Sequence, residues 1–144
     1  HRRNVQIIFQ NYNLLNYLNA YDNVLTAISI SDPKRKISKE MLDEYLNTFG
    51  IDKTKASRKV NKLSGGEQQR VAIARAIACN GEIILADEPT GNLDYDTSLA
   101  IMKLFRQLVD DYGKTVIMVT HNKELAKMTD TIIHIDQRNK NIYE

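Results

Sequence analysis

The sequence predicts an α/β fold in which a mostly parallel sheet is flanked by helices and a helical subdomain follows the first strand. Two observations support this prediction. From residue 80 onward, short apolar stretches alternate with amphipathic segments, a pattern typical of a parallel sheet covered by helices on both faces. Residues 11–79 are instead charged, with apolar residues at helical spacing. We therefore divide a single domain, residues 1–144, into a helical subdomain at about 11–79 and an α/β core formed by the rest.

The first half of the chain predicts one strand and three helices. Residues 5–9 are short, apolar and rich in β-branched side chains, as in a buried strand. Asp32 and Pro33 are expected to end the first helix because proline cannot continue it, and Gly50 suits the end of the second. The predicted ranges are a strand at 5–9 and helices at about 22–29, 38–49 and 65–79.

The second half predicts three strands separated by two helices. Gly81 is expected to end the helix that precedes the first of these strands. The longer helix is amphipathic, and five of its apolar residues are expected to face inward: Leu99, Met102, Phe105, Leu108 and Val109. The predicted ranges are strands at 83–86, 115–120 and 131–135 and helices at about 96–112 and 123–129.

Composition narrows the class of function. With 144 residues, of which 42% are hydrophobic, the chain is long and apolar enough for one folded domain. The formal charge of +2 gives no basic excess, so we expect no nucleic-acid partner. Cys79 is the only cysteine, which excludes a disulfide within the chain and fits a reducing compartment. No apolar run approaches the roughly 20 residues that cross a bilayer.

Residues 63–70, with the sequence LSGGEQQR, precede a predicted helix and allow two interpretations. Ser64 and Glu67 form S-x-x-E, the pattern of a capping box. Capping does not require Gly65 and Gly66, however, and two residues without side chains let another molecule approach the amides at the helix start. Bare amides and a hydroxyl at a helix N-terminus suit a phosphate. The residues alone leave both interpretations open.

Two carboxylates, Asp87 and Glu88, directly follow an apolar strand, at the edge where parallel sheets hold ligands. They could form a solvated strand end. Alternatively, one carboxylate could hold Mg²⁺ while the other orients and activates water for phosphoryl transfer. Residues 91–94 (GNLD) come next, and alone they predict a turn followed by a helix cap at Asp94.

Two further polar residues, His121 and Gln10, each follow a predicted strand. Neither is exceptional alone, since a histidine or glutamine at a strand end is more often exposed than functional. If the strands are neighbours, both residues lie at the same sheet edge as Glu88, where they could contact the same ligand. Five residues that follow Gln10 line either a docking groove or the interior of the helical subdomain: Tyr12, Leu14, Leu15, Tyr17 and Leu18.

These segments, in this order and at this spacing, resemble the motifs of ABC ATPases. LSGGEQQR resembles the signature motif, IILADEPT the Walker B motif with its catalytic glutamate, GNLD the D-loop, VTH the switch histidine and FQNYNLL the Q-loop. FQNYNLL, LADEPTGNLD and VIMVTH together look most similar to the subgroup that energises lipoprotein release, macrolide efflux and antimicrobial-peptide export or resistance. The resemblance extends over residues 5–135 and implies part of a P-loop NTPase fold.

The resemblance also implies a role for each residue. Glu88 would be the catalytic general base, and His121 would contact both that base and the γ-phosphate of ATP. Asp87 and Gln10 would serve Mg²⁺, and Asp94 would lie at a dimer interface. The signature residues would bind an ATP that the partner subunit holds; they are Ser64, Gly65, Gly66 and Glu67.

One family motif has no counterpart among the 144 residues, since they contain no G-x-x-x-x-G-K-[ST]. Such a P-loop supplies amides and a lysine to the phosphates. We therefore expect an N-terminally truncated cassette that alone shows little or no ATP binding or hydrolysis. The family's P-loop strand would separate the strands at 115–120 and 131–135. We expect any ordered crystal form to fill that gap by a swap, a dimer or a shifted strand.

The expected function is that of the ATP-binding subunit of an ABC transporter, at the cytoplasmic face of the membrane. Two such subunits, in a homodimer, would hydrolyse ATP with Mg²⁺ at their interface and drive a membrane permease. One alternative is a soluble ABC-type ATPase of DNA repair or translation. Those proteins usually carry coiled coils, zinc modules or tandem cassettes, which this sequence does not show. The other alternative is a non-catalytic fragment that binds a permease or a cassette.

Overall fold

The computed structural model describes residues 5–135. Its sheet consists of three parallel strands in the spatial order β1 (Val5–Ile8), β2 (Ile83–Asp87) and β3 (Thr115–Val119). The register sets Ile7 beside Leu85 and Leu85 beside Ile117, so these three side chains share one face of the sheet. The predicted α/β class with a parallel sheet is confirmed, and all three strands end at the same edge.

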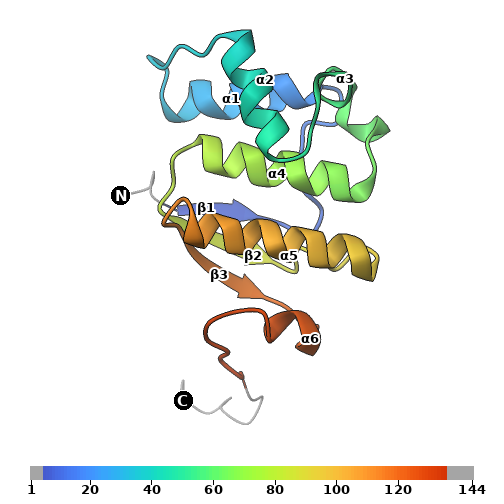
Figure 1. Ribbon diagram of the computed structural model, residues 1–144. Helices are drawn as coiled ribbons and strands as arrows, with labels where there is room; N and C mark the ends of the chain where they lie inside the picture. The colour runs from blue at the N-terminus through green and yellow to red at the C-terminus, as the bar shows by residue number, and fades with distance from the viewer. Residues whose placement is uncertain (1–4, 136–144) are drawn as a thin grey trace, which may run out of the picture.

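Helices make up most of the remaining described chain (Figure 1). In order along the chain they are α1 (Ala20–Ser31), α2 (Lys39–Thr48), α3 (Lys53–Ala56), the 3₁₀ turn η1 (Val60–Lys62), α4 (Gly65–Ala78), α5 (Tyr95–Asp110) and α6 (Lys123–Ala126). A polar side chain before each α-helix accepts a backbone N–H of its first turn, which explains where the helices begin. Within residues 5–135, no helix combines the length and the apolar character needed to span a bilayer.

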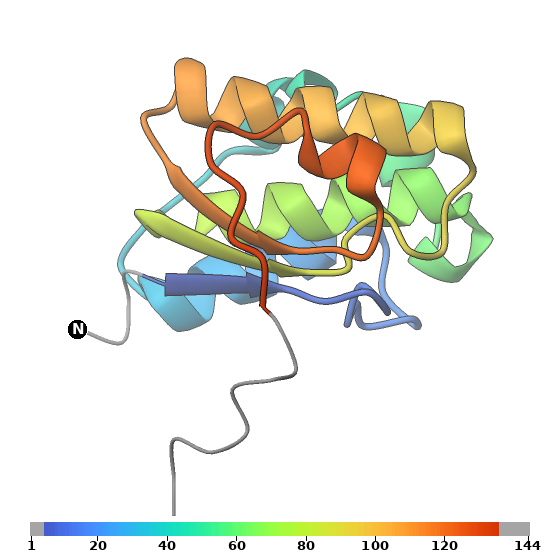
Figure 2. The same cartoon turned by 90° about the horizontal axis from the view of Figure 1, so that it is seen from below.

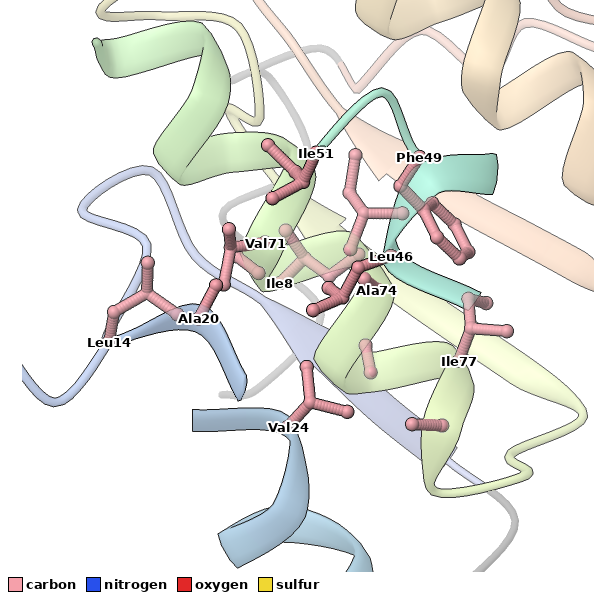
Figure 3. Packing of buried hydrophobic residues seen from close by; sticks show 14 of the residues in the cluster. Ile8, Leu14, Ala20, Val24, Leu46, Phe49, Ile51, Val71, Ala74 and Ile77 are labelled. Atoms are coloured by element: carbon pink, nitrogen blue, oxygen red, sulfur yellow. The ribbon is translucent and has the colours of Figure 1, made fainter. Parts of the chain in front are cut away.

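The central element of the packing is α4, which contacts β1 and α5 as well as α1 and α2. Figure 3 shows Ile8 of β1, Val24 of α1 and Leu46 of α2 gathered around this helix, and all three belong to one buried cluster. The Tyr45 hydroxyl of α2 donates to the Ala74 carbonyl of α4 at 2.6 Å, and burial raises the pKa of Tyr45. Because α4 lies between the sheet and these helices, it joins α1 and α2 to the sheet.

In the described residues, helices cover only one face of the sheet. The prediction that helices cover both faces is therefore wrong for this part of the chain. Both α4 and α5 lie on the same side of the strands (Figure 2). On that side, Ile8 and Ile84 are buried. On the opposite side, Ile7 is 48% exposed, and Ile117 and Val119 are each 54% exposed. We call this side the bare face; it consists of Val5, Ile7, Ile83, Leu85, Ile117 and Val119. The strands are apolar on both sides, yet only one side is packed.

Residues 131–135 do not form the predicted strand. They are irregular, and Ile133 and Ile135 are almost fully exposed. A strand needs a neighbour to satisfy its backbone groups, and among the described residues nothing pairs with the outer edge of β3. Arg106 of α5 forms an ion pair with Asp130, directly before the segment. The single chain therefore does not fill the gap by a shifted strand, and repair by a swap or a dimer stays a prediction.

The other predicted elements are present, and none of their ends is shifted by more than three residues. After α4 the left-handed position belongs to Asn80, with φ of 61°, and not to Gly81; asparagine tolerates this conformation because its side chain can bond locally. On α5, Ile101 and Leu104 are buried although the sequence did not predict them to face inward. Of the five predicted inward residues, Leu99 and Val109 are only half-buried, and the others are buried.

The bare face predicts self-association of the 144-residue chain. Exposed apolar side chains beside an unpaired strand edge favour contact with a second copy. We expect dimers or larger species. The double variant Ile7→Lys, Ile117→Lys is expected to shift the chain toward monomer, because it places a charge on each side of Leu85 on the bare face. Sedimentation velocity over a concentration series measures this. Ile30→Lys, at an exposed residue of α1, is the matched control. A parent chain that stays monomeric contradicts the prediction.

Candidate functional site

The carboxyl ends of the three strands meet at one cavity of about 640 Å³. The turn after β1, the loop between β2 and α5, and the loop after β3 all contribute to its walls. Gln10, Glu88 and His121, which follow three different strands, all line it. The strand order brings them together, because neighbouring parallel strands end at the same edge of a sheet.

Glu88 occupies a strained position directly after β2. Its φ is 45°, in the left-handed region that costs a non-glycine residue roughly 1–2 kcal/mol. Its N–H donates to the Val119 carbonyl of β3 at 2.9 Å, and its own carbonyl accepts from the Gly91 N–H at 3.0 Å. Strain of this kind persists where the surrounding bonds impose it, and it is concentrated at functional sites.

The Glu88 carboxylate lies beside His121. The distance between His121 Nε2 and Glu88 Oε1 is 3.3 Å, but the two groups are not aligned as a hydrogen bond, and the buried Oε1 has no hydrogen-bond partner in residues 5–135. The Glu88 side chain is 17% exposed, whereas that of His121 is 94% exposed. A buried oxygen without a partner is costly unless water or a ligand binds it. This carboxylate oxygen is therefore available to a water molecule or a polar ligand in the cavity.

Gln10 is held by Asn92, which sequence reasoning did not single out. Gln10 Nε2 donates to Asn92 Oδ1, and Asn92 Nδ2 donates to the Gln10 carbonyl, both at 3.3 Å. Gly91 makes room for this pair, since a Cβ there would lie 2.7 Å from Gln10 Nε2. Asn92 stands in the segment GNLD, but no spacing rule pairs two amides that are 82 residues apart.

Asp87 ends β2 with an exposed side chain and is not among the residues that line the cavity. No group of three or more His, Cys, Asp or Glu residues in the described part of the chain could hold a metal ion. Mg²⁺ usually takes one or two carboxylates and completes its shell with water and substrate phosphates. Asp87 and Gln10 would supply only two protein oxygens, so a Mg²⁺ site formed by them would need phosphate and water for its other ligands.

The predicted signature residues, 64–67, do not line this cavity and instead begin α4. Their capping box is present, because the Glu67 N–H donates to Ser64 Oγ at 3.2 Å and the Ser64 N–H donates to Glu67 Oε2 at 2.9 Å. Gly66 is buried against α5, and a Cβ there would lie only 2.5 Å from Thr97 Cγ2. The segment thus has a packing role within the chain, whatever it binds.

The capping box predicts a pH-dependent stability. The Ser64 amide, with Lys55 at 3.2 Å, lowers the pKa of Glu67. A lowered folded-state pKa stabilises the fold above the unfolded value of roughly 4.3, and this contribution is lost as pH falls through the folded-state pKa. Between about pH 7 and about pH 3, we expect the free energy of unfolding to fall more in the parent than in Glu67→Gln, as urea titrations measure. Equal losses would contradict the assignment.

Asp94 caps α5, because its Oδ2 accepts from the Thr97 N–H at 3.1 Å, and hydrogen bonds from Thr97 lower the pKa of Asp94. This agrees with the helix-cap interpretation of GNLD. The Asp94 side chain is exposed, and its place at a dimer interface stays a prediction. Thr97 also packs on Gly66, so a single residue of α5 contacts both segments.

The residues after Gln10 divide between the two roles that the sequence left open. Leu14 is buried in the core and Tyr12 packs against it. Tyr17 is exposed, Leu15 is half-buried, and Leu18 lines a groove of about 480 Å³ along α1. Packing therefore accounts for the first two residues, whereas Tyr17 and Leu18 are available to a partner.

Comparisons with known proteins decide the family. The sequence model of the ABC transporter family matches residues 1–91. This chain belongs to the ABC transporter family of ATP-binding proteins. The cassette is 47% identical over 133 residues to YclH of Bacillus subtilis, an uncharacterized ABC transporter ATP-binding protein, and the match covers 92% of the cassette and 59% of YclH.

Two further relatives support the same family. The lipoprotein-releasing system ATP-binding protein LolD of Francisella tularensis is 41% identical over 134 residues, covering 92% of the cassette and 58% of LolD. The solved ATP-binding cassette MJ0796, a dimer bound to ADP and Pi, superposes with a TM-score of 0.74 at 42% identity, covering 88% of this cassette and 56% of that chain. The cassette thus spans little more than half the length of the relatives that it matches.

Proposed function

We propose that this cassette supplies the water-activating part of an ATP hydrolysis site in an ABC transporter. The observation that carries the proposal is the convergence of Gln10, Glu88 and His121 on one cavity, where a buried carboxylate oxygen has no partner in the described residues. Glu88 acts as general base toward the attacking water. His121, 3.3 Å from the carboxylate, orients that base and contacts the γ-phosphate. The relatives YclH and LolD, which are named as ATP-binding proteins, support ATP as the bound nucleotide.

Mg²⁺ is the proposed cofactor and ATP the proposed substrate. When bound, Mg²⁺ neutralises charge that develops on the phosphates. Asp87 and Gln10 would hold it through their oxygens, together with the phosphates. Asn92 and Gly91 fix where the Gln10 side chain lies, so the amide is already in place before the nucleotide arrives.

The signature residues act on the ATP of a second copy. Residues 64–67 do not line the cavity of their own chain, so their phosphate-binding amides serve a site elsewhere. In a head-to-tail homodimer, Ser64, Gly65 and Gly66 of each cassette approach the cavity of its partner, with Asp94 at the interface. The dimeric state of MJ0796 supports an assembly of two copies.

The cassette couples hydrolysis to transport through a membrane permease, at the cytoplasmic face of the membrane. The groove along α1, beside the exposed Tyr17 and lined by Leu18 and Ile30, is the surface that suits an apolar permease segment. LolD, whose name places it in a lipoprotein-releasing system, supports a transport role. No feature of the described residues favours a soluble ATPase of DNA repair or translation.

Calorimetric titration with Mg·ATP tests which part of the site these residues supply. The 144 residues contain no P-loop to anchor the phosphates, so we expect the chain alone to show no micromolar binding. The comparison protein is a P-loop chimera, in which the P-loop-bearing segment of a related cassette precedes residue 1. We expect the chimera to bind and hydrolyse ATP. Tight Mg²⁺-dependent binding by the 144-residue chain, or a folded chimera that binds ATP without hydrolysing it, would contradict the proposal.

A further inference from the structure

The turn at residues 10–13, which we call the Q turn, contains two consecutive left-handed residues. The φ of Tyr12 is 62° and that of Asn13 is 48°. Asparagine tolerates this conformation, but a tyrosine adopts it only at an energetic cost. The Tyr12 N–H donates to the Phe9 carbonyl at 3.0 Å, and the Asn13 N–H donates to the Asn11 carbonyl at 2.6 Å. Such a turn persists only where neighbouring elements hold it.

Arg75 of α4 holds the Q turn from one side. Its Nη1 donates to the Asn13 carbonyl at 2.6 Å, and its Nη2 donates to the Tyr12 carbonyl at 3.1 Å. Both acceptors belong to the two left-handed residues, so their carbonyls converge on one planar guanidinium. A lysine cannot reproduce this fork, because it offers a single ammonium. Burial lowers the pKa of Arg75, yet a guanidinium remains charged and its hydrogen bonds are strong.

The first residue of the same helix also meets the Q turn. A Cβ on Gly65 would lie 3.0 Å from Tyr12 Oη, so the glycine allows the tyrosine to pack there. The turn is also joined to the loop after β2 by the two hydrogen bonds between Gln10 and Asn92. Helix α4 and the loop after Glu88 therefore both hold the Q turn.

We propose that Arg75 is a positioning residue that sets the place of Gln10 through the Q turn. Gln10 lies two residues before Tyr12, in the turn whose carbonyls Arg75 holds, so a movement of α4 relative to the sheet moves Gln10 in the cavity. The consequence for catalysis rests on the proposed function. Under that function, Ser64 at the start of the same helix contacts the nucleotide of the partner copy. Arg75 therefore links the cavity of its own chain to the signature residues, which face the cavity of the partner.

The first arm of the test measures hydrogen exchange in the 144-residue chain. We expect Arg75→Lys and Arg75→Ala to speed exchange of the Tyr12 and Asn13 amides about tenfold or more, because the turn opens locally. Exchange along α5 should stay unchanged. Arg70→Ala is the matched control, since Arg70 lies on the same helix but donates at 3.4 Å to the Phe49 carbonyl, away from the Q turn. Parental exchange in Arg75→Lys overturns the proposal.

The second arm measures ATP hydrolysis by the P-loop chimera. We expect Arg75→Lys to lower kcat about tenfold or more while KM for ATP stays within about twofold, as for a loss of positioning rather than of binding. A merely structural role would lower kcat only through the amount of folded protein, which circular dichroism and active-site titration report. A rise in KM alone contradicts the proposal. A parent chimera without any hydrolysis sinks the proposed function instead, and the exchange arm then decides the role of Arg75.

Discussion

Replacing Glu88 with glutamine is expected to lower kcat of the P-loop chimera by about a hundredfold or more, because a positioned general base contributes 10²–10⁴-fold. The substitution keeps the shape of the side chain and removes the charge that accepts a proton. In the parent, the Oε1 atom of Glu88 is buried and lies 3.3 Å from His121 Nε2. This is the atom that lacks a hydrogen-bond partner in the described residues. ATP binding should persist, since no phosphate anchor is lost.

Steady-state hydrolysis and nucleotide binding, measured on the same preparations, separate the two effects. Glu82→Gln is the matched control, because Glu82 is an exposed carboxylate directly before β2 and lies outside the cavity. A Glu88→Gln chimera that keeps more than about a tenth of the parental kcat would remove the general base from this account.

The second large effect concerns Gly66, where replacement by alanine is expected to destabilise the fold by about 1–3 kcal/mol. The new Cβ would lie 2.5 Å from Thr97 Cγ2, far inside contact distance, and α4 and α5 are both packed in the core. Helix propensity acts in the opposite direction, because alanine inside a helix is favoured over glycine by about 1 kcal/mol. A loss of stability would therefore show that packing outweighs propensity at this position.

Thr97→Ser provides the internal control for Gly66. It removes the clashing methyl and keeps both a hydroxyl and the backbone N–H that donates to Asp94 Oδ2. Urea denaturation of the two single variants and the double variant gives the coupling free energy, and we expect Thr97→Ser to recover most of the loss. Unchanged stability in Gly66→Ala, or no recovery in the double variant, would contradict the contact.

Much of the fold and the candidate site could be predicted because the decisive signals are local. Apolar runs of β-branched residues predict the strands, and polar caps such as Ser64 and Asp94 mark the helix starts. Once parallel strands are assigned, polar residues at their carboxyl ends must share one edge. The sequence therefore predicted that Gln10, Glu88 and His121 lie together if their strands are neighbours, and the observed strand order meets that condition.

The remainder depends on contacts between distant segments, which local patterns do not encode. The strand expected at 131–135 failed because its backbone has no neighbour to pair with among the described residues, however suitable its composition. The bonds from Arg75 to Tyr12 and from Asn92 to Gln10 join residues more than sixty positions apart. Gly66 was singled out for a phosphate, whereas its close approach to Thr97 emerges only from the packing of two helices.

The most direct test of the shared site mixes two variants of the P-loop chimera, Glu88→Gln and Ser64→Arg, each expected to be inactive alone. If each site joins Glu88 of one copy to Ser64 of the other, half of the randomly formed dimers are mixed and contain one intact site. Recovery of about a quarter of the parental hydrolysis rate is therefore expected. Two folded, ATP-binding, freely exchanging variants whose mixture stays inactive would show that the site is not divided between two copies.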